Sequence, residues 1–528
     1  MDTPCNREGR QSRHPRRLDT TRSPSLSSRP NDQLPRRGAP TGASASVEGI
    51  EVSTEHWIGG ERIGSSGAFA DVSPIDESTL AEVARGTAED ADRAVDAARA
   101  ATETWGRTSP KQRGEVLHRI ADLVQERVPE LAPVETRDNG SLVRSMRNSV
   151  MPRVARNFRF FADQLTQLRE SFEMDGFESR TEWDPSGVTA VITPWNAPLM
   201  LATWRVAPAL AAGNSVVLKP PEWAPLTASM LADVTKDAGL PDGAFNVLQG
   251  IGEEAGAALT GHPGVDRIAF TGSIETGKLV ARAAAANLTP TSLELGGKSP
   301  FVAFADADMD AVVKQAVNQF DNAGQVCLAG TRLILERSMA DVFLERFLEA
   351  AAALRQGDPR EETTDLGPQI TREHLERVDG FVRRAKAEGA TAILGGGPNE
   401  ELGGLYYRPT LFTDVPAGAE VLRKEVFGPV LTLQTFEEEE EAVALGNQTE
   451  YGLAAILYTG DRDRAERVAE RLVAGTVWVN CFFVRDLRAP FGGARRSGVG
   501  REGGVYSFDF YADVKNVCTA PWPQAAER

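Results

Sequence analysis

Short apolar runs alternate with helical stretches between residues 187 and 286, and this alternation restricts the fold more than any other feature of the chain. The runs have the length of strands and consist mainly of apolar or β-branched residues, at 187–192, 215–218, 245–248 and 267–270. Strands that alternate with helices predict a parallel sheet with helices against its faces. This part of the chain is therefore predicted to form a Rossmann-like unit.

A second alternation of the same kind begins near Pro300. Its apolar runs lie at 301–304, 331–335 and 475–479. The chain has 528 residues, which is three to four times a usual domain of roughly 150 residues. The sequence therefore predicts an α/β protein with two sheet-based lobes.

Composition narrows the classes of partner. The chain carries 58 Lys and Arg against 75 Asp and Glu, a net charge of −17, which disfavours nucleic acids and anionic membranes as partners. The longest apolar stretch is interrupted by prolines and by Arg205, so no membrane span is expected. The scattered cysteines and histidines predict a cytoplasmic protein without a metal site.

Local patterns predict several further elements. Residues 1–47 are rich in Arg, Ser, Pro and Gly and lack aromatic residues, so they are predicted to form a disordered tail. A hairpin is expected at residues 57–60, and a helix after Thr87, where Asp90 completes a capping box. Further helices are expected within 110–137 and 148–165. The acidic run at 437–441 is expected to open another helix.

Three segments contain residues suited to catalysis. Cys327 lies in FDNAGQVCLAGTR, among small residues that would let a substrate approach its sulfur. Glu294 precedes two glycines in LELGGKSP, where its carboxylate could activate water. Trp195 and Asn196 follow an apolar strand in VITPWNAP, and ligands bind where parallel strands end. Taken singly, Cys327 and Glu294 each have an ordinary explanation, as a buried thiol and as a solvated turn residue.

Together and in this order, the three segments resemble the aldehyde dehydrogenase superfamily, over residues from about 50 to 520. The resemblance extends to motifs at 218–225, 270–277, 424–430, 447–455 and 490–504. It implies a variant Rossmann NAD-binding domain, an α/β catalytic domain and a small β oligomerisation arm. The implied boundaries are 48–165 with 183–295 for the first domain, 296–504 for the second, and 166–182 with 505–522 for the arm.

The resemblance also implies a mechanism. The Cys327 thiolate attacks an aldehyde carbon, and the Asn196 side-chain amide and the Cys327 backbone N–H donate to the resulting oxyanion. Glu294 then activates the water that hydrolyses a thioester to a carboxylic acid. A relative that passes the acyl group to coenzyme A would generally lack this glutamate.

The cofactor implied by the resemblance is NAD, with NADP still possible. Lys219 and Glu222 would reach the adenosine ribose, and a carboxylate there favours free hydroxyls over a 2′-phosphate. Gly272 and Ser273 would open a helix whose N–H groups face the pyrophosphate. The remaining matched cofactor positions are Trp195, Gly252, Glu425 and Phe427.

The C-terminal stretches 481–493 and 500–518 most resemble hydroxymuconate- and aminomuconate-semialdehyde dehydrogenases, whose substrates carry a carboxylate. Arg485 and Arg153 could then grip that carboxylate together. Alternatively, the two arginines pair with Asp486 or with surface acids. The matched apolar tunnel residues are Trp204, Met200 and Phe491.

Other interpretations stay open at this point. The substrate could instead suit a broad-specificity or betaine-type enzyme, and the chain could be a silent structural protein on the same scaffold, as some lens crystallins are. The resemblance implies a homodimer or homotetramer, in which the arm adds a strand to a neighbour's sheet.

Overall fold

A computed structural model of the protein describes residues 44–165 and 170–522. The predicted tail at 1–47 lies outside these residues except for its last four. Those four, Ser44–Val47, form strand β1, which pairs with β2 (Ile50–Ser53). The predicted boundary at residue 47 is therefore wrong, because Val47 is 2% exposed and belongs to the hydrophobic core.

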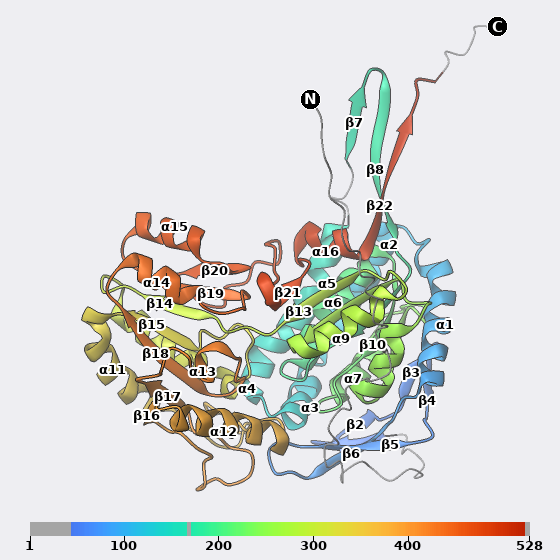
Figure 1. The fold of residues 1–528 in the computed structure, drawn as a ribbon. Helices are drawn as coiled ribbons and strands as arrows, with labels where there is room; N and C mark the ends of the chain where they lie inside the picture. The colour runs from blue at the N-terminus through green and yellow to red at the C-terminus, as the bar shows by residue number, and fades with distance from the viewer. Residues whose placement is uncertain (1–43, 166–169, 523–528) are drawn as a thin grey trace, which may run out of the picture. The chain divides into compact units, whose positions relative to one another are not determined.

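An eight-stranded sheet forms the first lobe, in the order β21-β13-β12-β9-β10-β11-β3-β4. Its central strands run parallel, as predicted (Figure 1): β9 (Val188–Ile192), β10 (Ser215–Lys219), β11 (Phe245–Val247), β12 (Arg267–Gly272) and β13 (Thr291–Leu295). At the edge, β3 (His56–Ile58) and β4 (Glu61–Ile63) form the predicted hairpin.

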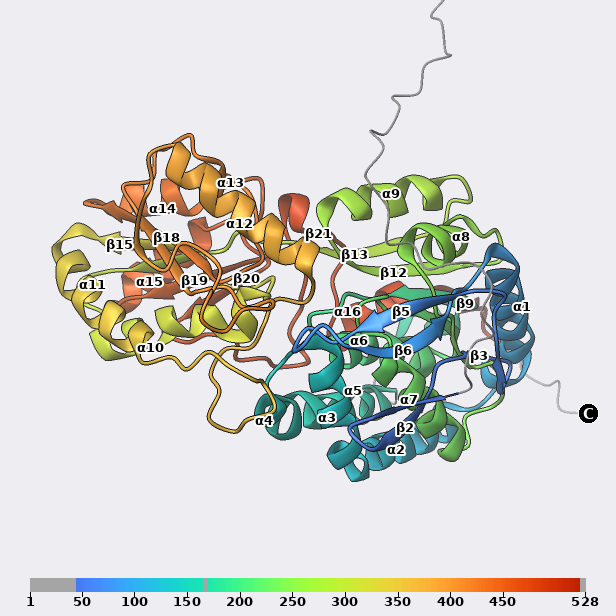
Figure 2. The same ribbon diagram turned by 90° about the horizontal axis from the view of Figure 1, so that it is seen from below.

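Helices cover both faces of this sheet (Figure 2). Val188, Ala190 and Ile192 of β9 share a core with helices on one face, and Val191 shares a core with helices on the other. The first group is α1 (Ala88–Trp105), α8 (Ala257–Gly261) and α9 (Ile274–Ala285). The second group is α2 (Pro110–Glu126), α3 (Val128–Asn139), α5 (Met151–Gln164), α6 (Pro198–Ala212) and α7 (Leu226–Asp237).

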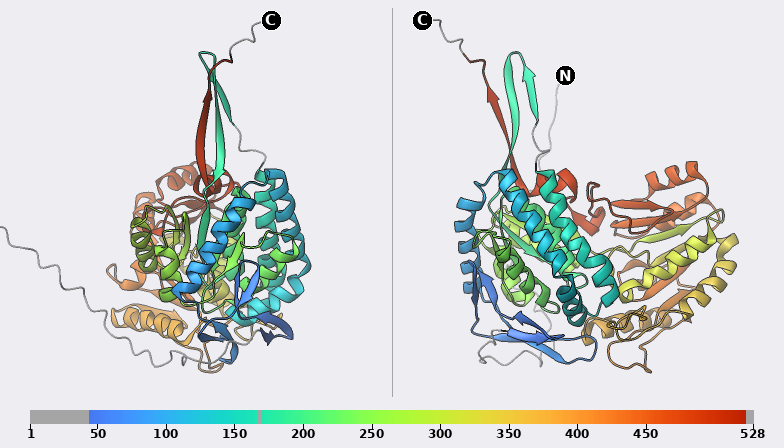
Figure 3. Two further views of the ribbon diagram at one scale, coloured as in Figure 1. Left: turned by 90° about the vertical axis from the view of Figure 1, so that its right-hand side faces the viewer. Right: turned by 180° about the vertical axis from the view of Figure 1, so that it is seen from behind.

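For two of the predicted helical stretches, single residues explain where the helices begin and end. Helix α1 begins as predicted, with Thr87 and Asp90 in a capping box. The stretch 110–137 contains two helices, because Pro129 cannot donate the backbone hydrogen bond that a continuous helix needs. Helices α2 and α5 pack side by side (Figure 3).

A seven-stranded sheet forms the second lobe, in the order β16-β17-β18-β15-β14-β19-β20. Its strands are β14 (Pro300–Ala303), β15 (Arg332–Glu336), β16 (Thr391–Leu394), β17 (Thr410–Thr413), β18 (Val430–Phe436), β19 (Ala454–Tyr458) and β20 (Thr476–Val479). Only β16 pairs antiparallel within this sheet. Its helices are α10 (Met309–Val317), α11 (Arg337–Ala352), α12 (Arg372–Ala387), α13 (Glu420–Arg423), α14 (Glu439–Gly446) and α15 (Arg462–Arg471). Helix α14 opens on the acidic run, as predicted.

The C-terminal part of the chain returns to the first lobe. Strand β21 (Gly498–Val499) pairs with β13, and α16 (Gly504–Tyr511) packs against α6. Leu487, Phe508 and Tyr511 are buried in the core of the first lobe. The predicted start of the arm at residue 505 therefore needs correction, since α16 packs into the core of the first lobe and also contacts β22 of the arm.

The arm is a three-stranded antiparallel ribbon in the order β22-β8-β7. Its strands are β7 (Ser171–Met174), β8 (Phe177–Pro185) and β22 (Ala512–Thr519). Phe172, Met174 and Val514 on these strands are each more than half exposed.

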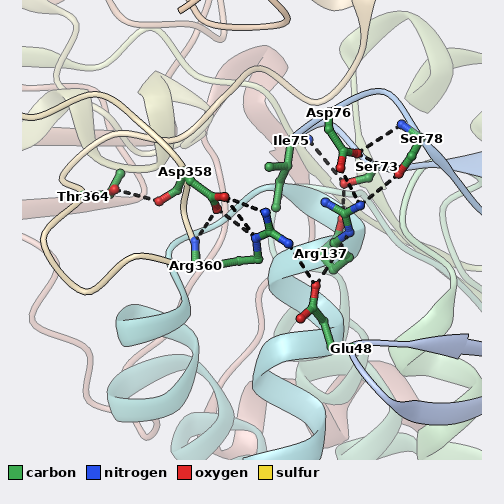
Figure 4. A network of polar contacts seen from close by, with 9 residues as sticks. All are labelled: Glu48, Ser73, Ile75, Asp76, Ser78, Arg137, Asp358, Arg360 and Thr364. Atoms are coloured by element: carbon green, nitrogen blue, oxygen red, sulfur yellow. Dashed lines mark hydrogen bonds and ion pairs between the residues drawn. The ribbon is translucent and has the colours of Figure 1, made fainter.

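A polar network joins the turn between β1 and β2 to both lobes (Figure 4). Glu48 lies in this turn and faces Arg137 of α3 at 3.8 Å and Arg360 at 3.3 Å. Arg137 also pairs with Asp76 at 2.7 Å, and Arg360 pairs with Asp358 at 2.6 Å. The network thereby links the first lobe to the loop that follows α11.

Candidate active site

Cys327 lies in a loop after the short helix η3 (Asn318–Gly324) and is half-buried. The backbone of a second segment approaches it closely, because a Cβ on Gly297 would clash with the Cys327 carbonyl oxygen. Burial raises the pKa of the Cys327 thiol to about 12, helped by the charges of Glu425 and Glu294, although backbone N–H groups near the sulfur oppose the shift. The thiol therefore needs a base or a bound positive charge to become a nucleophile at neutral pH.

Glu294 lies on β13 and is 5% exposed. Neither carboxylate oxygen has a hydrogen-bond partner among residues 44–165 and 170–522. Burial, and then the negative charge of Glu502, raise the pKa of Glu294 to about 8. A carboxyl group that titrates near neutral pH suits a general base.

Asn196 connects the first lobe to the loop of Cys327. It follows β9, and its side-chain Nδ2 donates to the Gln325 carbonyl at 2.9 Å. Gln325 is two residues before Cys327. The structure thus brings the predicted amide donor and the predicted nucleophile into one constellation.

The predicted adenosine-side residues lie where β10 ends. Lys219 is 2% exposed, and its Nζ lies 2.7 Å from a carboxylate oxygen of Glu222. Burial alone would raise the pKa of Glu222, but the charge and hydrogen bond of Lys219, together with backbone N–H donors, lower that pKa below its usual value. A Cβ on Gly252 would lie 3.8 Å from the Glu222 carboxylate, so the glycine leaves space beside an ionised acid.

The predicted pyrophosphate site is a helix start. Gly272 ends β12, and Ser273 caps α9 by accepting from Thr276 N at 3.1 Å. The first N–H groups of a helix attract anions. The residues at the end of β10 and at the start of α9 therefore fit an anionic dinucleotide.

Glu425, Phe427 and Trp195 form the other predicted cofactor region. Glu425 accepts from Gly297 N at 3.0 Å, and burial raises its pKa to about 7. The rings of Trp195 and Phe427 meet edge to face at 5.3 Å. Sequence reasoning missed His374 of α12, whose Nε2 lies 2.7 Å from the Phe427 carbonyl and whose ring contacts Trp195. No local sequence pattern around His374 predicts these contacts with Phe427 and Trp195.

Arg153 and Arg485 lie over one aromatic ring. Their guanidinium carbons are 5.5 and 4.9 Å from the centre of the Trp204 ring, and Arg485 also lies 3.9 Å from the centre of the Phe491 ring. Burial lowers the pKa of each arginine to about 10. Within the described parts of the chain, neither arginine has a carboxylate in ion-pair contact.

The alternative pairing with Asp486 does not occur in the structure. Asp486 pairs with Arg488 instead, at 2.6 Å. Of the remaining predicted tunnel residues, Phe491 packs against the same core as Cys327, and Met200 packs against the core of the first lobe.

A buried ion pair beside Glu294 was also missed. Arg205 of α6 and Glu502 form this pair, and each side chain is 1% exposed. Arg205 also donates to Thr271 Oγ1 at 2.9 Å. A signal for this pair existed, because Arg205 is the only charged residue in the apolar helix α6.

Lys298 is another buried charge near the site. It is 2% exposed, and its Nζ finds no hydrogen-bond partner in the described structure. Burial lowers its pKa to about 7. In the residues that the structure describes, no cluster of His, Cys, Asp and Glu is suited to a metal ion, and no helix is long and apolar enough to cross a membrane.

Comparison with known proteins identifies the family. The model of the aldehyde dehydrogenase family matches residues 62–517. The 2-hydroxymuconic semialdehyde dehydrogenase of Pseudomonas sp. (strain CF600) is 44% identical over 479 residues, which cover 88% of this chain and 99% of the relative. The 2-aminomuconic semialdehyde dehydrogenase of Danio rerio is 41% identical over 473 residues, covering 88% and 97%.

Comparison with solved structures points to the same family. The betaine aldehyde dehydrogenase of Staphylococcus aureus, solved in complex with NAD+, has a TM-score of 0.87 and 37% identity, covering 90% of this chain and 96% of its own. The family match spans both lobes and includes Cys327, Glu294 and Asn196. The chain therefore belongs to the aldehyde dehydrogenase family.

Proposed function

We propose that this aldehyde dehydrogenase oxidises a semialdehyde that also carries a carboxylate, of the hydroxymuconate type, with NAD as the cofactor. The observation that carries the substrate class is the pair Arg153 and Arg485, two half-buried guanidiniums over one indole ring without a carboxylate partner in the described chain. Unpaired buried charges are costly, so their presence favours a substrate that neutralises them.

In the proposed mechanism, the Cys327 thiol loses its proton to solvent, and the resulting thiolate attacks the aldehyde carbon. The oxyanion accepts from the Cys327 backbone N–H and from the second N–H of the Asn196 amide, since the first is used on Gln325. Each such donor contributes about 3 kcal/mol to the transition state. Bound NAD would supply the acceptor for the departing hydride.

Glu294 completes the reaction in this proposal. Its carboxylate takes a proton from water, and the resulting hydroxide attacks the thioester carbon, so the Cys327 thiolate leaves and a carboxylic acid forms. Its raised pKa, near 8, keeps it able to exchange protons close to neutral pH. This base favours hydrolysis over transfer to coenzyme A.

The cofactor proposal is supported by the Lys219–Glu222 pair and by the start of α9. Glu222 would accept from two ribose hydroxyls, whereas a 2′-phosphate would meet a negative charge. We infer NAD rather than NADP from this carboxylate.

A betaine-type substrate is the second candidate, since betaine aldehyde and aminoaldehyde dehydrogenases are among the similar proteins. A cationic aldehyde would need free aromatic faces. The faces of Trp204 and Phe491 already carry the Arg485 guanidinium, which would repel a second cation. This contact favours the anionic substrate.

Substrate preference tests the proposal. The variant Arg485→Gln should raise KM for 2-hydroxymuconate semialdehyde roughly 10- to 100-fold, since hydrogen bonds to charged groups contribute about 1.5–3 kcal/mol. KM for an uncharged aldehyde of similar size should change little. Arg488→Gln is the matched control, because Arg488 is exposed and pairs with Asp486 in the same loop. Equal effects of Arg485→Gln on both substrates would rule out the carboxylate contact.

We also propose a homodimer or homotetramer and a cytoplasmic location. The exposed apolar side chains of the arm, including Phe172 and Met174, support association between copies. The free thiols of Cys327, Cys481 and Cys518 support a reducing compartment. Light scattering that gives the mass of a single chain would contradict the proposed assembly.

A further inference from the structure

The loop before Cys327 has an unusual backbone. Asn322 and Ala323 both adopt the left-handed conformation, with φ of 51° and 53°, and Gly324 follows with φ of 74°. Residues other than glycine seldom adopt this conformation, and asparagine tolerates it better than most. The loop therefore depends on its surroundings to keep this shape.

The side chain of Asn322 is bound at both ends. Its Nδ2 donates to the Asn196 carbonyl at 3.1 Å, and its Oδ1 accepts from the Ser141 hydroxyl at 2.9 Å. A backbone carbonyl can only accept, so the amide nitrogen must be the atom that faces Asn196. Asn322 thus joins the loop of Cys327 to two segments of the first lobe.

Three amide side chains close a ring around this junction. Asn322 donates to the backbone of Asn196, Asn196 donates to the backbone of Gln325 at 2.9 Å, and Gln325 donates to the backbone of Asn322 at 3.0 Å. Each side chain therefore holds the main chain of the next residue in the ring. The ring fixes the Asn196 amide relative to the loop that carries Cys327.

We propose that Asn322 is a positioning residue for the oxyanion-binding amide of Asn196. The inference rests on the proposed function, in which Asn196 donates to the oxyanion formed at the aldehyde carbon. Asn322 holds the Asn196 backbone, and the ring aims the second N–H of the Asn196 amide beside the sulfur. Displacing a catalytic group by about 1 Å can reduce a rate by 10²-fold.

The test compares Asn322→Gly and Asn322→Asp. Glycine accepts the left-handed conformation without a side chain, and aspartate keeps the shape and the Ser141 contact but loses the donor to Asn196. Both variants should lower the rate of the first-turnover NADH burst about 10- to 100-fold. KM for NAD and the rate of Cys327 alkylation by iodoacetamide should stay within about twofold of the wild-type values. A general loosening of the structure would instead alter the burst rate, KM for NAD and the alkylation rate together.

A double-mutant cycle separates positioning from structural damage. Asn196→Ala should slow the burst about 10²–10³-fold, and adding Asn322→Gly should slow it little further, because Asn322 acts through Asn196. Gln369→Leu is the matched control, since Gln369 donates to the Ala323 carbonyl of the same loop but not to Asn196. In the double variant, the fold-decrease in burst rate caused by Gln369→Leu should multiply with the fold-decrease caused by Asn196→Ala.

The outcomes are distinguishable. A wild-type burst in both Asn322 variants, or effects of Asn322→Gly and Asn196→Ala that multiply in full, would overturn the inference alone. A wild-type burst in Asn196→Ala would overturn the proposed role of Asn196 itself. If Asn322→Gly does not fold, as judged by thermal melting, Asn322→Asp carries the same comparison.

Discussion

Ionisable side chains at the end of β10 and those around Cys327 differ in whether they have a partner of opposite charge. At the end of β10, the Lys219 ammonium lies 2.7 Å from the Glu222 carboxylate, a partner only three residues away. Around Cys327, the Glu294 carboxylate lacks a hydrogen-bond partner within the described ranges, and the Arg485 guanidinium lies on aromatic rings.

This difference in partners separates the proposed cofactor site at β10 from the proposed reaction site around Cys327. Burial of an ionisable group without a partner costs free energy, so we expect Glu294 and Arg485 to be retained for a molecule that is not part of the chain. In the proposed function, the paired charges at β10 instead form a fixed surface for the cofactor. Altering Glu294 or Arg485 should therefore change turnover or substrate KM, and altering the Lys219–Glu222 pair should change cofactor affinity.

The largest expected effect comes from Glu294→Gln. The amide keeps the size of the side chain but cannot take a proton, so steady-state turnover should fall about 10²–10⁴-fold. The first-turnover burst of NADH should persist, because hydrolysis follows hydride transfer. Stopped-flow absorbance measures both phases, and a variant that hydrolyses at the wild-type rate would remove Glu294 from the mechanism.

Glu222→Gln, in the charge pair at the end of β10, should have a smaller effect than Glu294→Gln. Losing a charged acceptor should raise KM for NAD roughly 10- to 100-fold. Because the repulsion of a 2′-phosphate is also removed, the preference for NAD over NADP should narrow, with kcat nearly unchanged. Steady-state kinetics with both cofactors would measure this, and an unchanged preference would place the discrimination elsewhere.

The pH dependence of hydrolysis should change rates by smaller factors. The pKa of Glu294 is raised to about 8, so its basic form is the minor one at neutral pH. Decay of the acyl-enzyme should therefore quicken by up to about tenfold per pH unit below 8 and level off above it. In Glu294→Gln the slow residual decay should lose this inflection, which rapid-quench measurements between pH 6 and 9.5 would reveal.

The smallest effect is expected in the exposed network of Figure 4. Arg360 is 41% exposed and already has partners in Glu48 and Asp358, so Arg360→Gln should lower the free energy of unfolding by no more than about 1 kcal/mol. Catalytic rates should stay at the wild-type level. A large loss of activity in this variant would show that paired surface charges also affect the residues around Cys327.

Local patterns predict much of the fold and the centre of the site. The apolar runs at 187–192 and 215–218 are strands, and Thr87 with Asp90 caps a helix, because these signals depend on neighbours in sequence. Cys327 and Asn196 come from motifs that resemble a family, and the structure brings them together through Gln325.

Long-range contacts account for what the sequence could not predict. Glu502 meets Arg205 across 297 positions of chain, and His374 meets Phe427 from a separate helix. The return of α16 to the first lobe depends on burial of Phe508 and Tyr511 against residues far earlier in the chain. The periodicity of a local sequence does not predict contacts between residues so far apart in the chain.

The covalent role of Cys327 is the central claim, and Glu294→Gln offers the most direct view of it. Mixing this variant with NAD and an aldehyde, then quenching in acid, should trap an added acyl mass, and peptide mapping should locate it on the peptide that contains Cys327. The same experiment on Glu294→Gln combined with Cys327→Ala should show no added mass. An acyl group on another residue, or NADH formed at the wild-type burst rate without Cys327, would contradict the account.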